Sequence, residues 1–80
     1  MSKQPAVEAA SAIIATMTEG SAKDGSNESW REKQPIYHLL KAQSHLATHL
    51  RNMVDPRKAD DEDHLKLAVT RLAMALAQRD

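Results

Sequence analysis

The chain lacks cysteine and phenylalanine, and its large aromatic side chains are limited to Trp30 and Tyr37. Without cysteine there is no disulfide framework, no zinc ribbon and no thiol nucleophile. The remaining core formers are Leu, Ile, Val, Met and Ala, which bury a modest area each. Eighty residues lie near the smallest size at which one core suffices. We therefore expect one small domain over residues 1–80, stabilised by homo-oligomerisation.

An excess of charge and a long apolar run are also missing. Eleven basic and eleven acidic residues cancel, which disfavours a nucleic-acid partner because such proteins usually carry a basic surface. No apolar run approaches the roughly 18 residues of a transmembrane helix, and the first residues lack the apolar region of a signal peptide. We expect a cytoplasmic protein that binds neither nucleic acid nor a membrane.

Three stretches carry apolar residues at helical spacing and predict α-helices over residues 5–19, 35–54 and 61–78. The first should begin at Pro5 and stop at Gly20, a typical residue after a helix end. The second should lie between Pro35 and Asp55-Pro56, because a proline disfavours helical geometry at the residue before it.

The segments between these helices are predicted from their turn-forming and charged residues. Asp60 or Asp61 should cap the third helix. Residues 1–4 should fray, and residues 20–34, rich in Gly, Ser, Asn and Asp, should form a loop. The connection between the second and third helices is short, and both helices have an apolar face. We therefore expect them to form an antiparallel pair. The fold class is therefore all-α, a three-helix chain within an oligomeric helical bundle.

The second helix carries two stripes. Its apolar face, which we expect to form the core, contains Ile36, Leu39, Leu40, Leu46, Leu50 and Met53. A second stripe, expected along the edge of that core, contains His38, Ala42, His45, His49 and Asn52. The third helix should bury Leu65, Ala68, Val69, Leu72, Ala75 and Leu76. Leu67 and Met74 then form a spare face, a candidate subunit contact.

Two clusters can carry chemistry. His45 and His49 are spaced so that both rings could reach one metal ion, although Leu46 stands where a zincin has Glu. The acids of residues 60–63, followed by His64, suit Mg²⁺, a hard cation that also binds substrate phosphates. The alternatives are a half-buried histidine pair at a core edge and a capped helix with solvated acids. For Trp30 the alternative to ligand binding is closure of one end of the core.

The order of these short motifs resembles a known family. GSAKDG is followed by Asn27-x-x-Trp30-Arg31, Pro35 before LLKA, His45-Leu46, and an acidic turn running into His64-Leu65. Over residues 5–78 this is similar to the N-terminal domain of phage-type dATP/dGTP diphosphohydrolases, which belong with the MazG-like all-α NTP pyrophosphatases. The chain departs from the family pattern at Asp24, where Tyr is usual, and at Ser44, where Arg is expected. It also lacks the paired E-x-x-E and E-x-x-D helix motifs.

The resemblance implies a nucleotide-binding domain that releases pyrophosphate from a dNTP with the help of Mg²⁺. In that hypothesis Asp61 and Glu62 hold the metal, and His45, His49 and His64 are catalytic. The nucleotide-binding residues are Lys23, Asn27, Trp30 and Arg31, whose loop should fold over the histidines and acids at one end of the helix pair.

The alternative is a non-catalytic, phage-type helical accessory or inhibitor protein that acts on a protein partner. Such a protein would keep the helical fold but would not hydrolyse a nucleotide. A DNA-binding helix-turn-helix is a third possibility, disfavoured by the zero net charge and the acidic start of the third helix.

Overall fold

The computed structural model describes residues 3–24 and 29–79, with the backbone alone for residues 21–24. Its elements in chain order are α1 (Pro5–Asp24), the 3₁₀ helix η1 (Ser29–Glu32), α2 (Pro35–Val54), the 3₁₀ helix η2 (Pro56–Lys58) and α3 (His64–Gln78). These described ranges contain no strand. The predicted all-α class and three helices are therefore confirmed.

The bounds of α2 match the prediction at both ends. Pro35 occupies the first turn, where a missing N–H costs little. At the other end the backbone N–H of Asp55 donates to the carbonyl of Arg51, and Pro56 then begins η2. The two prolines thus delimit α2 by removing helical geometry from the residues that precede them.

The predicted stop of the first helix at Gly20 is wrong. Helix α1 continues through Gly20 to Asp24, so part of the expected loop over residues 20–34 is helical. Glycine destabilises a helix interior, but a helix ends at a glycine only where that residue adopts the left-handed conformation of a C-cap. A Cβ added at Gly20 would meet nothing within 4 Å, so close packing does not require a glycine there.

The start of the third helix also differs from the prediction. Helix α3 begins at His64 rather than residue 61, and its cap is Asp63, whose Oδ1 accepts from the backbone N–H of Lys66 at 3.1 Å. Of the two predicted caps, Asp60 is engaged by the His64 ring, and Asp61 lies with it in the connector. The acids before Asp63 therefore do not cap α3 and lie in the connector that precedes it.

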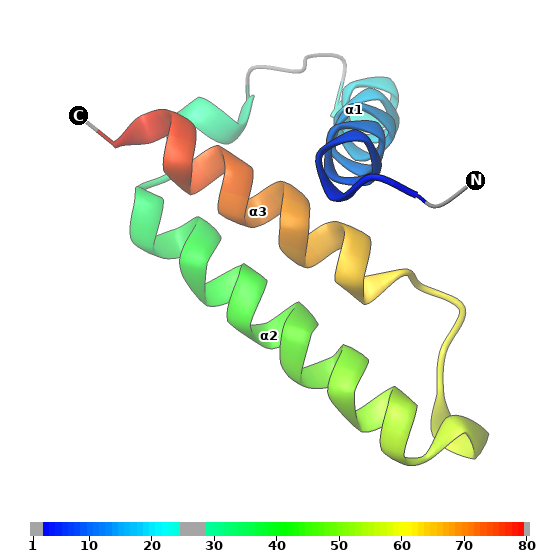
Figure 1. Ribbon diagram of the computed structural model, residues 1–80. Helices are drawn as coiled ribbons and strands as arrows, with labels where there is room; N and C mark the ends of the chain where they lie inside the picture. The colour runs from blue at the N-terminus through cyan, green and yellow to red at the C-terminus, as the bar shows by residue number, and fades with distance from the viewer. Residues whose placement is uncertain (1–2, 25–28, 80) are drawn as a thin grey trace.

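Helices α2 and α3 lie side by side and antiparallel (Figure 1), which confirms the predicted pair. Helix α1 packs on α3. In Figure 1 it is seen nearly end-on, while α2 and α3 lie across the view. Helix α3 is therefore the central element, with α1 on one side and α2 on the other.

The contact between α2 and α3 is made by histidine, alanine and arginine rather than leucine. His38 and Ala42 are the buried residues of α2, and those of α3 include His64, Ala68 and Ala75. His38 pairs with Arg71 and, seven residues along each helix, His45 pairs with His64. We call this line of contacts the seam. The stripe expected at the edge of the core is thus the contact itself, because its alanines permit close approach and its polar groups find partners.

The predicted leucine core is wrong for the single chain. Nine large apolar side chains on α2 and α3 are 44–66% exposed, and we call all of them except Leu40 the apolar face: Ile36, Leu39, Leu46, Leu50, Met53, Leu65, Leu72 and Leu76. Most follow a seam residue by one position, as Leu46 follows His45 and Leu65 follows His64. One residue further along a helix, the side chain points 100° away. Because the two helices are antiparallel, this step directs the side chains of both helices to the same side of the pair.

The spare face predicted from Leu67 and Met74 is also wrong. Both side chains are half-buried, and α1 packs on α3. The surface that remains open for a partner is therefore the apolar face.

Candidate functional site

Two histidines and two carboxylates gather where the connector enters α3. The Nδ1 atoms of His45 and His64 are 2.9 Å apart. On the other edge of its ring, His64 Nε2 lies 3.0 Å from both carboxylate oxygens of Asp60 and 3.8 Å from Glu62 Oε2. His64 is 7% exposed, whereas Asp60 and Glu62 are open to solvent. We call these four residues the histidine–carboxylate cluster.

The register of the helix pair and the short connector together place this cluster. The His38–Arg71 contact aligns α2 with α3 so that His45 comes opposite His64. The connector is tied back to α2 by Asn52 Nδ2, which lies 3.5 Å from Asp60 Oδ1. The backbone N–H of His64 donates to the carbonyl of Glu62 at 3.1 Å. Asp60 and Glu62 are therefore held beside the ring rather than spread into solvent.

The hydrogen bonds assign the protons of the cluster when both rings are neutral. His64 donates its Nε2–H to Asp60, so its Nδ1 accepts from the Nδ1–H of His45. Burial, followed by the neighbouring His64, lowers the pKa of His45 below 6.5. The hydrogen bond from His64 lowers the pKa of Asp60 below 3.8. Neutral His45 and ionised Asp60 are the favoured forms at neutral pH.

This arrangement can hold a metal ion. Donor atoms of Asp60, Glu62 and His64 all lie within 4.8 Å of one another. Imidazole nitrogen and carboxylate oxygen are ligands for divalent cations, and a carboxylate on the outer ring nitrogen is a common partner of a metal-binding histidine. The identity of a bound ion depends on which of these donors it uses.

A second polar group lies at the other end of α3. His38 is completely buried; its Nε2 donates to the carbonyl of Trp30 at 2.9 Å, and its Nδ1 accepts from Arg71 at 3.0 Å. The amide of Gln78 donates to the carbonyl of Lys33 at 2.8 Å. The bond from His38 ties η1 to α2. The bond from Gln78 ties the segment between η1 and α2 to the end of α3. With its ring nitrogens thus occupied, His38 is a structural residue.

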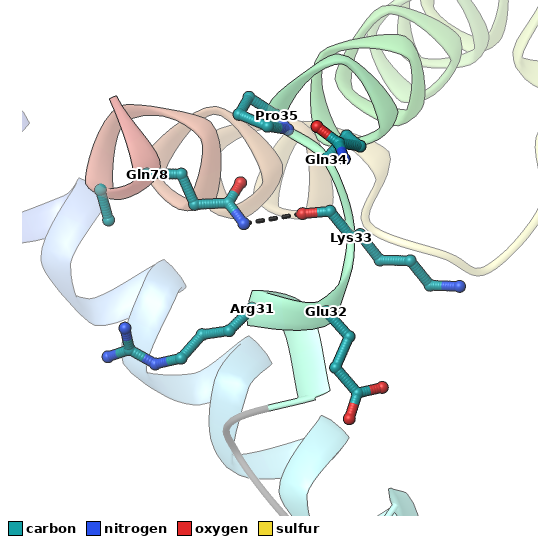
Figure 2. A pocket seen from close by; sticks show the side chains of 7 residues that line it. Arg31, Glu32, Lys33, Gln34, Pro35 and Gln78 are labelled. Carbon is teal, nitrogen blue, oxygen red and sulfur yellow. Dashed lines mark hydrogen bonds between the residues drawn. The ribbon is translucent and has the colours of Figure 1, made fainter. Parts of the chain in front are cut away.

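A shallow pocket of about 360 Å³ opens beside these anchors. Its lining comprises Arg31, Glu32, Lys33, Gln34, Pro35, Ala77 and Gln78. Figure 2 shows the Gln78–Lys33 hydrogen bond across it, with the charged ends of Arg31, Glu32 and Lys33 directed outward. Because its charged groups diverge, the pocket is not a preformed ligand site.

The structure brings together His45, Glu62 and His64 from the predicted site residues. His49, one turn further along α2, is half-buried and is not part of the group that can hold a metal, and the same holds for the exposed Asp61. Asp60 takes the place predicted for Asp61, because the carboxylate one turn before His64 reaches its ring.

Of the predicted nucleotide-binding residues, Trp30 and Arg31 do not lie over the cluster. Asn27 and the side chain of Lys23 lie outside the described residues. Trp30 and Arg31 lie in η1, which packs against the end of α3 at Gln78. That end is roughly 21 Å along the helix from His64, at 1.5 Å per residue. Arg31 stacks on the Trp30 ring, with its guanidinium carbon 4.7 Å from the ring centre.

Sequence reasoning missed Asp60 as a site residue and His38 and Arg71 as partners. The signal was the spacing of seven residues, which relates His38 to His45 and His64 to Arg71. Two polar pairs at equal spacing on antiparallel helices indicate one seam.

Comparisons with protein-family models, with curated proteins and with solved structures gave no match. Within residues 3–24 and 29–79, no helix has both the length and the apolar character needed to cross a membrane.

Proposed function

We propose that the protein is a MazG-like domain that binds a nucleoside triphosphate together with Mg²⁺ and releases pyrophosphate from it. The observation that carries the proposal is the meeting of two motif segments far apart in the chain. His45 belongs to one, and Glu62 and His64 to the other, and they form one cluster at the seam. These are the segments on which the family resemblance depends.

Within the cluster, the carboxylates fit Mg²⁺ best. Mg²⁺ prefers oxygen ligands and keeps several waters, which suits the exposed side chains of Asp60 and Glu62. The hydrogen bond from His64 orients Asp60 and favours its ionised form. A bound Mg²⁺ would neutralise charge on the triphosphate. His64, whose two ring nitrogens are engaged by Asp60 and His45, would hold the carboxylate in place, and His45 would orient the attacking water through its Nε2.

A single chain does not complete this site, because Arg31 lies at the far end of α3. We propose that two chains join across their apolar faces, with each α2 antiparallel to the partner's α2. Such a twofold arrangement brings the η1 end of one chain beside the cluster of the other. Arg31 then reaches the phosphates in trans.

The exposure of the apolar face supports this association. Its eight large apolar side chains are each 44–66% exposed, and a stable interface buries about 800 Å² on each partner.

Complementation between two variants tests the composite site. Purified protein is incubated with each dNTP and Mg²⁺, and pyrophosphate is measured. Asp60→Asn and Arg31→Ala should each be inactive, and their mixture should recover about a quarter of the normal rate, because half of the dimers hold one intact site of two. Asp61→Asn is the matched control and should retain turnover. Pyrophosphate release without recovery would place the whole site in one chain.

The second candidate is an accessory protein that acts by binding a protein partner, and the exposed apolar face favours it. In this alternative the same face takes up a helical surface of another protein. A complete lack of dNTP affinity in Mg²⁺, with no pyrophosphate from the unmodified protein, would support it over the nucleotide hypothesis.

A further inference from the structure

The seam side of the histidine–carboxylate cluster differs from its solvent side. Asp60 and Glu62 approach the Nε2 edge of His64, whereas the Nδ1 edge faces only the Nδ1 of His45 among the hydrogen-bonding contacts described. Two imidazole nitrogens therefore point at one spot between the helices. Imidazole is a poor ligand for Mg²⁺ but a preferred ligand for Zn²⁺ and other late divalent transition metals.

We propose that His45 and His64 form a site for a Zn²⁺-class ion through their Nδ1 atoms. The proposal of this metal site does not depend on nucleotide binding. In a tetrahedral Zn²⁺ site, metal–nitrogen bonds of about 2.0–2.1 Å separate the two nitrogens by about 3.3 Å. The present separation is 2.9 Å, so the rings need to part by a few tenths of an ångström and each needs to turn by about 35°, which brings both lone pairs onto the metal of a tetrahedral site. The metal displaces the proton that the two nitrogens now share.

The surroundings of His64 suit a metal ligand. Its Nε2–H donates to the Asp60 carboxylate at 3.0 Å, an interaction that fixes the tautomer with a free Nδ1 lone pair and raises the basicity of the ring. His64 is 7% exposed, so its orientation is held by packing. Asp60 is then a positioning residue, not a ligand.

His45 is half-buried, so water can complete the coordination of an ion held by the two Nδ1 atoms. Glu62 approaches the opposite, Nε2 edge of His64 at 3.8 Å and is not placed to be a ligand. Two histidines completed by waters form a donor set in which Zn²⁺ retains exchangeable positions.

The test uses the full chain without a histidine tag, stripped of metal with a chelator. Zn²⁺ alone is titrated by calorimetry, and Co²⁺ alone is followed by its visible absorption, which is intense for tetrahedral sites. We expect one ion per chain. Long-range ¹H–¹⁵N spectra of the histidine rings should show a shift at Nδ1 of His45 and His64, with Nε2 of His64 still protonated.

Variants separate this site from binding at the carboxylates. His45→Gln should weaken Zn²⁺ binding at least about tenfold, and Asp60→Asn should weaken it about tenfold through the loss of ring orientation. His49→Gln is the control, since it removes an imidazole one turn away on the same helix, and it should bind normally. Circular dichroism confirms that each variant is folded. Unchanged affinity in folded His45→Gln, or no binding up to millimolar Zn²⁺, would overturn the proposal.

Discussion

At the residue scale, His38 shows how a polar side chain can organise a helix pair. It is fully buried and bridges the carbonyl of Trp30 and the guanidinium of Arg71. Removing it leaves the partly buried Arg71 without this acceptor and the Trp30 carbonyl with the 3.5 Å contact from Gln78 Nε2. An unpaired group in a partly buried place costs more than a bond contributes. The cavity left by the ring adds to the loss.

We expect His38→Ala to lower the free energy of unfolding by about 3 kcal/mol, from two lost buried hydrogen bonds and a cavity. Chemical denaturation at one fixed protein concentration measures it. His49→Ala, at a half-buried position on the same helix, should cost less than about 1 kcal/mol. Equal losses in the two variants would contradict a special role for His38.

The pH dependence of stability is expected to report His45. Burial and the neighbouring His64 lower its pKa in the folded state below 6.5. As the pH falls below 6.5, the unfolded chain therefore binds a proton that the folded chain does not, and stability decreases until the folded pKa is passed. The other charges acting on His45 are Glu62, Arg71 and Lys41.

Thermal unfolding in the presence of a chelator between pH 7.5 and 5 tests this expectation. The melting temperature of the unmodified protein should fall with acidification, and His45→Gln should fall less steeply because one of the titrating groups is gone. A steeper fall in the variant would contradict the assigned direction of the pKa shift.

At the scale of elements, a substitution at Gly20 tests whether α1 ends at this residue or continues through it. If Gly20 ended the helix in a left-handed conformation, alanine there would be strained. Because α1 continues through it and a Cβ would meet nothing within 4 Å, Gly20→Ala should stabilise the protein by about 0.5–1 kcal/mol. The melting temperature measures this effect, and a decrease would place the helix end at Gly20.

The start of α3 gives a second test of an element boundary. The Asp63 side chain accepts from the backbone N–H of Lys66, so Asp63→Ala should lower the free energy of unfolding by about 1 kcal/mol. Asp61→Ala, two residues earlier in the connector, should change it by less than about 0.5 kcal/mol. Denaturant titration of the two variants decides between the caps.

At the scale of the whole molecule, the main feature is the contrast between the seam and the apolar face. The buried apolar residues of the described chain are Ala42, Ala68 and Ala75, whereas every leucine of α2 and α3 except the half-buried Leu67 is exposed. Alanines contribute little transfer free energy compared with leucines. In the proposed dimer, association through the apolar face would supply the larger burial, and joining two such pairs would give a four-helix arrangement.

We expect a mass of at least twice the 8.9 kDa chain by sedimentation at tens of micromolar. Leu46→Glu or Leu72→Glu, which place a charge within the apolar face, should shift the protein to a single chain. Ile14→Glu on α1, also an exposed apolar position, is the control and should not change the mass. A single-chain mass for the unmodified protein would contradict association through this face.

Local sequence signals were enough to predict the three helices and most of their bounds. Pro35 and Asp55-Pro56 act locally on backbone geometry, so α2 was predictable without knowledge of its neighbours. Gly20 and the run of acids before His64 gave wrong bounds because each residue type has two common uses. A glycine can end a helix or lie within one, and any of four acids can cap.

The tertiary structure decided which stripe of α2 meets α3. Periodicity places His38 and His45 on one stripe and Leu39 and Leu46 on the next, but hydrophobicity alone favours the leucines for the core. The register of the antiparallel pair instead matches each histidine with a polar partner on α3. A polar group can be buried only where its partner is in reach, and here the partners lie 19 and 33 positions away in the chain. For this reason only the folded chain identifies the seam, the cluster beside it and the apolar face left open.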